Sequence, residues 1–148
     1  MWTTVLETPT PQNPFADGDP CVPLDHHVVV PIARGGVDSC TVKSGTKIFV
    51  TAWANECSTF EGNGTTEAEP RACAVRADAD ITSTPTVVVD GQSLPVTEVQ
   101  TGLLSIRLPR DNFFAEKAAD RNGLSVAHGW VVLLQPLAAG KHRIHIYV

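Results

Sequence analysis

The sequence predicts an all-β protein, an antiparallel β-sandwich of the jelly-roll or immunoglobulin-like type with one or two short inserted helices. Three observations support this fold class. Short runs rich in Val, Ile and Thr recur about every 8–20 residues and are separated by clusters of Gly, Pro, Asn and Asp. The dipeptide Asp90-Gly91 is the signal of a two-residue hairpin turn. Residues 46–53 carry apolar side chains at odd and even positions, which is typical of a strand buried on both faces.

The first half of the chain begins with an irregular arm and continues with short strands. Residues 8–25 contain five prolines, so they fit neither a helix nor a central strand, and we expect this arm to lie over the body of the domain. Strands are expected at 27–32, at 38–43 and at 46–53. Pro31 indicates that the first of these strands lies at the edge of a sheet.

A polar loop over residues 54–69 leads into the one helix that has a clear start signal. Thr66 and Glu69 have the spacing of a capping box, in which two side chains bond to backbone amides at the start of a helix. Pro70 also suits the first turn, because its missing N–H has no partner there in any helix. Alanines follow, so we expect a short helix over about residues 68–78.

The second half supplies more regular strands. Five are expected, at residues 84–89, 92–99, 102–108, 129–136 and 142–148. The last two are joined by only a few residues, so we expect them to pair antiparallel. The intervening loop has room for one more helix over residues 112–119, with Asp111 as its N-cap.

Length and charge limit the class of protein. The chain has 148 residues, with 11 Lys and Arg against 16 Asp and Glu, and a formal net charge of −5. This length predicts a single domain over residues 1–148. The acidic balance argues against a nucleic-acid partner, which needs a basic face. The longest apolar runs, at 28–33 and 130–134, are far shorter than the ~20 residues of a membrane-spanning helix.

The four cysteines are spaced as a disulfide framework. Cys21, Cys40, Cys57 and Cys73 form no close C-x-x-C pair, which argues against a zinc knuckle or a thioredoxin-like redox motif. Four cysteines allow three pairings, and we favour the sequential one, Cys21 with Cys40 and Cys57 with Cys73. Each bond would then close a short loop and contribute about 3 kcal/mol in the chain-entropy model. The alternative is four reduced thiols buried as small apolar groups.

The same cysteines bear on the location of the protein. They lie in loops rich in Pro, Gly, Asn and Asp, which pack little and gain most from a disulfide. The first residues contain no basic segment and no apolar core of a signal peptide. We therefore expect a secreted or extracytoplasmic protein whose signal peptide is absent from this sequence.

The segment 53–61 is the densest cluster of side chains suited to binding. It offers the aromatic Trp53, the amide Asn55 and the carboxylates Glu56 and Glu61. An aromatic ring with polar groups around it suits a sugar, which stacks on the ring and bonds through its hydroxyls. His128 is the histidine best placed to join Trp53, Asn55 and Glu56 in one ligand-binding cleft. The alternative is structural, with Trp53 in the core and Glu56 bonded to backbone amides.

Paired carboxyls also suit a glycosidase. Glu56 with a second acid, Glu61 or Asp111, could supply the two carboxyls that such enzymes place about 5 or about 6.5–9.5 Å apart. Asp111 has a structural alternative as a helix cap. The motifs G-x-S-x-G, H-E-x-x-H, the Walker loop and G-x-G-x-x-G are all absent from the sequence.

The five histidines give no metal-ligand pattern. His142 and His145 are three residues apart on an expected strand, so their side chains point to opposite faces. His26 and His27 are adjacent and also diverge. We therefore expect no metal site, and no cofactor is implied.

Three segments carry a resemblance to a known family. They are CTVKSGTKIF at 40–49, NECSTFEG at 55–62, and GWVVLLQPLAAGKHRIHI at 129–146. With them the chain resembles an uncharacterised family of small secreted bacterial β-sandwich proteins over nearly its whole length. The resemblance implies export and two loops closed by disulfides. It supplies no reaction.

Three interpretations of function follow. The leading one is an extracellular binding or structural module without catalysis, whose ligand is a carbohydrate or a protein. The alternative is a hydrolase or lyase that acts on a glycan through paired carboxyls. A third is a subunit of a surface assembly, in which an exposed strand edge at 28–30 pairs with a neighbour.

Overall fold

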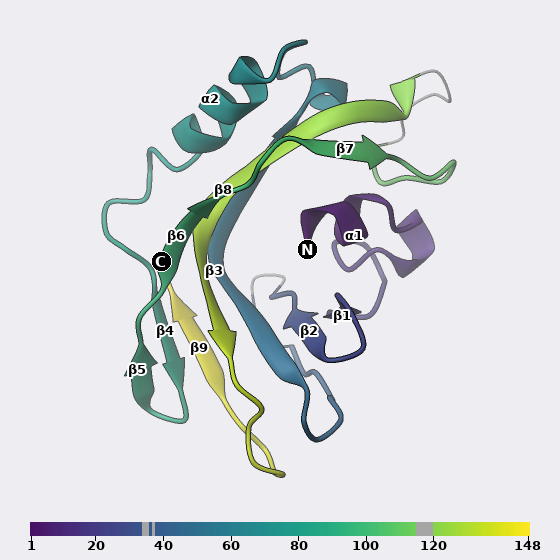
Figure 1. Cartoon of the computed structure of the whole chain (residues 1–148). Helices are drawn as coiled ribbons and strands as arrows, with labels where there is room; N and C mark the ends of the chain where they lie inside the picture. The colour runs from purple at the N-terminus through teal and green to yellow at the C-terminus, as the bar shows by residue number, and fades with distance from the viewer. Residues whose placement is uncertain (34–35, 37, 115–119) are drawn as a thin grey trace.

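The protein consists mostly of β-strands arranged in two sheets, with a few short helices (Figure 1). The structure is a computed structural model and describes residues 1–33, 36, 38–114 and 120–148. The larger sheet is built on two long, curved strands, β3 (Lys47–Ser58) and β8 (Asn122–Leu134), which pair antiparallel along their length. Its remaining strands are β1 (Cys21–Pro23), β2 (Val28–Pro31), β6 (Thr97–Gln100) and β7 (Leu104–Arg107).

The smaller sheet has the order β5 (Gln92–Leu94), β4 (Thr86–Val89) and β9 (Ile144–Tyr147), and all of its pairs are antiparallel. Asp90 and Gly91 join β4 to β5 with φ angles of 51° and 87°. A type I′ turn needs positive φ at both central residues, so the hairpin predicted from this dipeptide is confirmed.

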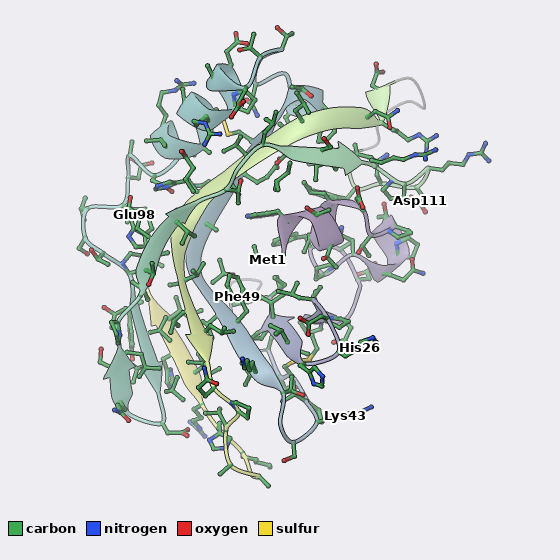
Figure 2. All side chains as sticks on the ribbon, in the orientation of Figure 1. Met1, His26, Lys43, Phe49, Glu98 and Asp111 are labelled. Carbon is green, nitrogen blue, oxygen red and sulfur yellow. A yellow bond between two sulfur atoms is a disulfide. The ribbon has the colours of Figure 1, made fainter. Side chains whose placement is uncertain are left out.

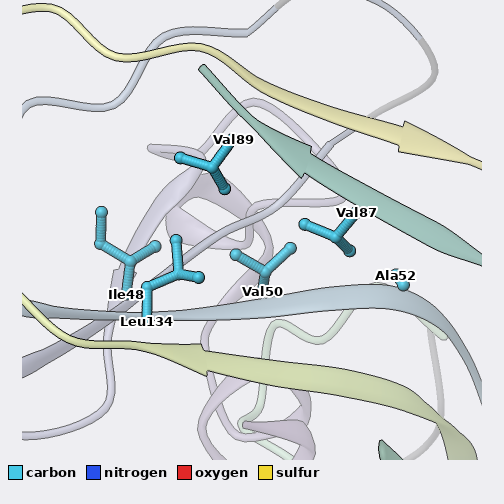
Figure 3. Close-up of a cluster of buried hydrophobic side chains, with 6 residues drawn as sticks. All are labelled: Ile48, Val50, Ala52, Val87, Val89 and Leu134. Carbon is cyan, nitrogen blue, oxygen red and sulfur yellow. The ribbon is translucent and has the colours of Figure 1, made fainter. Parts of the chain in front are cut away.

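The two sheets pack face to face where β3 begins and β8 ends. Figure 3 shows Ile48, Val50 and Leu134 of the larger sheet pointing toward Val87 and Val89 of β4. These side chains form a buried apolar cluster together with Ala52. Burial of such side chains contributes roughly 1.5–3 kcal/mol each, so this cluster is a main source of stability for the pair of sheets.

The N-terminal arm covers the opposite, concave face of the larger sheet (Figure 1). Helix α1 (Trp2–Leu6) precedes the arm at 8–25, which was expected to be irregular. The arm itself contains the 3-10 helix η1 (Thr10–Gln12) and strand β1, so it is regular in these two short stretches. Two further apolar clusters lie beneath it, one around Val5 and Val30 and one around Leu6 and Leu108. The expectation that β3 is buried on both faces is therefore confirmed.

Helix α2 (Ala68–Arg76) lies on the other, convex face, beyond the 3-10 helix η2 (Thr59–Glu61) (Figure 1). Glu69 accepts hydrogen bonds from the backbone N–H groups of Thr65 and Thr66, and these bonds lower the pKa of its carboxyl. The predicted helix is thus confirmed, but only the Glu69 half of the capping box forms. Thr66 Oγ1 donates to Glu69 Oε2 instead of accepting from a backbone N–H, and the N-cap is Glu67. Arg71 binds the carbonyl oxygen of Thr101 and ties the helix to the end of β6.

Two disulfides join Cys21 to Cys40 and Cys57 to Cys73. The sequential pairing favoured from the sequence is therefore confirmed, and the alternative of four reduced thiols is wrong. The first bond holds the N-terminal arm beside the segment before β3. The second holds α2 against the end of β3.

Four expectations about strands are wrong, and one about a helix lies largely outside the described residues. Residues 38–43 form no strand, and 28–31 is not at an edge, because β1 pairs with one side of it and β3 with the other. The β2–β3 pair is parallel, so the larger sheet is mixed rather than antiparallel throughout. The last two strands belong to different sheets, since the connection after Leu134 crosses from one sheet to the other. The helix expected over 112–119 falls largely outside the described residues.

Candidate functional site: an acid pair beneath aromatic rings

A β-bulge in β3 decides which face receives the acidic side chains. Thr51 pairs with Val131 and Trp53 with Trp130, so Ala52 is an extra residue in the ladder. Side chains alternate along a strand, and one extra residue reverses that alternation beyond it. Consequently Glu56 points to the concave face with α1, although the regular pattern of Ile48 and Val50 would have sent it to the convex face.

Glu56 and Glu61 form a hydrogen-bonded pair of carboxyls on this concave face. Two hydroxyl groups complete a short polar chain. Ser125 of β8 donates to Glu56 Oε1 at 2.5 Å, and Ser58 donates to Glu61 Oε2 at 2.5 Å. Ser58 and Ser125 are fully buried cross-strand partners, whereas Glu61 is exposed in η2. The pair therefore runs from the sheet to the surface.

The pKa of Glu56 is raised from 4.5 to about 8. Burial is the main cause, because it disfavours the charged form. The hydrogen bond from Ser125 lowers the pKa in part, and the charge of Glu61 raises it again. At neutral pH Glu56 thus holds a proton, which it can donate to the carboxylate of Glu61.

Aromatic rings line an open cavity of about 260 Å³ beside these carboxyls. Trp2 of α1, Phe15 of the arm, and Phe113 and Phe114 of the loop after β7 line it together with Glu56 and Glu61. Ligand pockets for drug-sized molecules measure roughly 300–1,000 Å³. The present cavity therefore has the size for a single ring or a short side chain.

The rings form a continuous chain of contacts. Trp2 stacks on Phe15 with ring centroids 5.9 Å apart, Phe15 contacts Phe113 at 6.5 Å, and Phe113 contacts Phe114 at 4.1 Å. Phe15 is 46% exposed, so the chain reaches the surface. The indole Nε1 of Trp2 is buried and has no hydrogen-bond partner among the described residues. Buried donors are rarely left unpaired, so this group is an exception among the described residues.

A second polar cluster lies on the convex face, around Asp78. Trp53 Nε1 donates to Asp78 Oδ1 at 2.9 Å, and Asn55 Nδ2 donates to the same oxygen at 2.5 Å. His128 Nδ1 bonds to Asp78 Oδ2, and His128 Nε2 lies 3.2 Å from Glu98 Oε1. Trp53, Asn55 and His128 all bond to Asp78, so the cluster joins the turn after α2 to the sheet.

The structure thus divides the residues that the sequence singled out. Trp53, Asn55 and His128 meet at Asp78, but Glu56 lies on the other face and does not join them. Glu56 does meet Glu61, the first of its two suggested partners. Asp111, the other one, is exposed at the edge of the molecule and does not line the cavity (Figure 2).

The aromatic wall, formed by Trp2, Phe15, Phe113 and Phe114, was not predicted from the sequence, and neither was the role of Asp78. Trp2, Phe15 and Phe113 are far apart in the chain, and no local pattern links them. Trp2 lies in α1, just before the arm that was expected to be irregular, and nothing in the sequence indicates this helix. The one available hint was composition, because four of the five phenylalanines lie outside the strands, at Phe15, Phe60, Phe113 and Phe114.

A larger hollow of about 430 Å³ lies along β7 and β8, near Glu7 and Arg107. It has no aromatic side chain and no carboxyl pair, so it offers less specific chemistry than the smaller cavity. In the part of the chain that the structure describes, no three His, Cys, Asp or Glu residues are grouped to hold a metal ion. None of the described helices is long and apolar enough to cross a membrane.

Comparison with models of known families, with curated proteins and with solved structures finds no match for this chain. The acid pair and the rings around it must therefore be interpreted from their own chemistry. They combine apolar faces, one proton donor, one carboxylate and one unpaired indole N–H. Those are the groups that bind a ligand with both a flat apolar face and several polar atoms.

Proposed function

We propose that this protein is an extracytoplasmic binding module of β-sandwich fold, and that it binds one sugar ring of a glycan between the aromatic rings and the acid pair. The observation that carries the proposal is the cavity that joins Trp2 and Phe15 to Glu56 and Glu61. A pyranose has a flat face that stacks on aromatic rings and hydroxyls that bond to carboxyls. The indole of Trp2 would supply one of the ring faces for this stacking.

Two other features support the compartment and the fold. The two disulfides fit an oxidising environment outside the cytoplasm. The two sheets share one apolar cluster, as the layers of a β-sandwich do. A jelly-roll or immunoglobulin-like arrangement is the finer form of this proposal.

The acid pair also bears on catalysis. A glycosidase needs one protonated and one ionised carboxyl, and the raised pKa of Glu56 suits the protonated role. However, the two carboxyls bond to each other. An inverting enzyme needs a separation of about 6.5–9.5 Å and a retaining one about 5–5.5 Å, and two carboxyls in direct hydrogen bond are closer than either. We therefore propose binding without turnover.

The indole N–H groups give a direct test by nuclear magnetic resonance. The protein has three tryptophans, and the spectrum of the Trp2→Phe variant identifies the signal of Trp2. We expect a monosaccharide titration to shift the Trp2 signal and to leave the Trp53 signal in place. Trp53 is the internal control, because its N–H already bonds to Asp78 on the other face.

Two results would contradict this proposal. One is a series of sugars that leaves the Trp2 signal unchanged at every concentration. The other is turnover of a glycan that is lost in the Glu56→Gln variant, since that variant keeps the shape of the protonated acid and removes its acidity. The second result would make the protein a hydrolase or lyase.

A further inference from the structure

We propose that the sugar bound in this cavity carries a protonated amine, so that the ligand is a hexosamine unit rather than a neutral hexose. This inference rests on the proposed function and names the class of its ligand. The amine would lie beside Glu61, with the sugar ring against the aromatic wall. The charge of Glu61, the aromatic rings and the proton of Glu56 each support this ligand.

The charge of the cavity is not neutralised within the described protein. Glu61 is exposed, and among the described residues it bonds to Glu56 and to the neutral hydroxyl of Ser58. No described Lys, Arg or His forms an ion pair with Glu56 or Glu61. A neutral hexose would leave this carboxylate without a counter-charge, whereas an ammonium group would supply one.

The aromatic wall favours a cation in the same place. Ring faces carry negative electrostatic potential, and they attract ammonium groups within about 6 Å of their centroids. Trp2 and Phe113 line the cavity along with Glu61. A ligand with an amine on a sugar ring therefore uses the rings twice, for stacking and for stabilising its charge.

The acid pair can also change its own charge when a charged ligand binds. The groups that face Glu56 are Glu61 from η2, Ser58 at the end of β3 and Ser125 from β8, while α1 contributes Trp2 and Leu6. Glu61 is the one charged group among them. An ammonium group beside the pair would stabilise the ionised form of Glu56, so its proton would leave for solvent as the ligand binds.

Three sugars separate this inference from the proposed function. The probes are glucosamine, glucose and N-acetylglucosamine, which differ at one substituent, and the readouts are calorimetry and the Trp2 indole signal at pH 6. We expect glucosamine to bind about tenfold more tightly than the two neutral sugars, as for one charge-assisted hydrogen bond. We also expect it to release up to one proton, measured in two buffers of different ionisation enthalpy.

Two variants locate the effect. Glu61→Gln should reduce the affinity for glucosamine to that for glucose, and Glu56→Gln should abolish proton release. Asp80→Asn is the control, because it removes an exposed carboxylate in the turn after α2, on the other face of the sheet, and should change neither quantity.

The outcomes are distinct. Equal affinity for glucosamine and glucose, with the Trp2 signal shifted by each, would overturn the inference and leave sugar binding intact. An unchanged glucosamine affinity in Glu61→Gln would also overturn it. No shift of the Trp2 signal with any of the three sugars would overturn the inference and the proposed function together.

Discussion

At the scale of single residues, Glu56 is the most unusual group in the protein. Its carboxyl is drawn to the sheet by Ser125 and kept neutral by burial and by the charge of Glu61. A group with such a pKa stores its proton in the folded state and loses it on unfolding. Stability must therefore depend on pH through this one residue.

We expect the protein to lose stability as the pH rises from about 4.5 to about 8. Over this range the unfolded chain has released the proton of Glu56 while the folded chain still holds it, so ionisation favours unfolding. The slope should approach about 1.4 kcal/mol per pH unit, and it should vanish above the folded pKa. Urea denaturation at a series of pH values measures it.

Other carboxyls titrate near the lower end of this range, so the comparison must be with Glu56→Gln. That variant mimics the protonated acid at every pH and should be the more stable protein at pH 8. If the two proteins show parallel pH profiles, the proton is not held in the folded state.

The exposed pair of Asp90 and His142 is a second pH-dependent contact. The hydrogen bond from His142 lowers the pKa of Asp90, and the same bond raises the pKa of His142. His142 also bonds to the carbonyl oxygen of Ala138 through its other ring nitrogen, which requires the protonated ring. This contact therefore favours the folded state while Asp90 is ionised and His142 is protonated. It weakens as the pH rises through the folded pKa of His142, in the same sense as Glu56, and as the pH falls through the folded pKa of Asp90.

At the scale of elements, the bulge in β3 connects the core to the candidate site. It allows Ile48 and Val50 to face the smaller sheet while Glu56 faces α1. Gly129 stands opposite Ala54, next to the bulge. A Cβ atom at Gly129 would lie 2.2 Å from the carbonyl oxygen of Trp53, which is backbone and cannot move aside.

Gly129→Ala should therefore destabilise the protein by more than about 2 kcal/mol, the range of an overpacked core position. It should also disturb the acid pair, because the alternation beyond the bulge depends on this contact. Gly91→Ala is the matched control. It has open space for a Cβ and a φ of 87°, so its cost should be limited to about 1–2 kcal/mol of backbone strain.

Thermal denaturation gives the two stabilities, and the Trp2 indole signal gives the effect on the site. We expect Gly129→Ala to change both and Gly91→Ala to change stability alone. Equal losses of stability in the two variants, with an unchanged Trp2 signal, would mean that the strand near the bulge can relax.

The elements also show what could be predicted from the sequence. The Asp90-Gly91 turn, the helix that begins near Glu69 and the two disulfides depend on neighbours along the chain, and local chemistry sufficed for them. The bulge has no signature in the residues of β3, because it is defined by the pairing with β8. Without the bulge, the sequence does not indicate which face Glu56 occupies. The sequence-based prediction therefore places Glu56 in one cleft with Trp53 and His128.

At the scale of the whole molecule, the two disulfides act on parts that pack differently. Helix α2 buries only Pro70 and Ala74, so the Cys57–Cys73 bond is its main anchor beside Arg71. The N-terminal segment already packs through Val5 and Leu6, and the Cys21–Cys40 bond adds a covalent link to it.

Replacing Cys57 and Cys73 by alanine should lower the free energy of unfolding by about 3 kcal/mol, from the loss of one short closed loop. Urea denaturation measures the loss, and the Cys21→Ala, Cys40→Ala double variant is the matched comparison. Mass spectrometry gives the covalent check, since reduction should add two hydrogens for each bond. A mass that reduction leaves unchanged would contradict the pairing.

The large-scale arrangement was predicted less well than its parts. The sequence indicated a β-rich domain, but the parallel β2–β3 pair and the separation of β8 from β9 depend on where the chain crosses between sheets. Short connections usually join neighbours, and here the segment after Leu134 does not. Trp2, Phe15 and Phe113 likewise come together only when the N-terminal segment folds onto the sheet, so their contact could not be predicted from neighbouring residues.

The pairing of β3 with β8 has a consequence for the order in which the molecule folds. Ser58 pairs with Ser125 and Ile48 with Leu134, so the central pair of strands encloses most of the second half of the chain. Contacts between such distant segments form slowly, because a long loop must close first. The two disulfides close loops that end by Cys73 and need none of β8. We therefore expect them to form early and the central strand pair late, so that an early intermediate would already be covalently closed while its longest strand still lacks its partner.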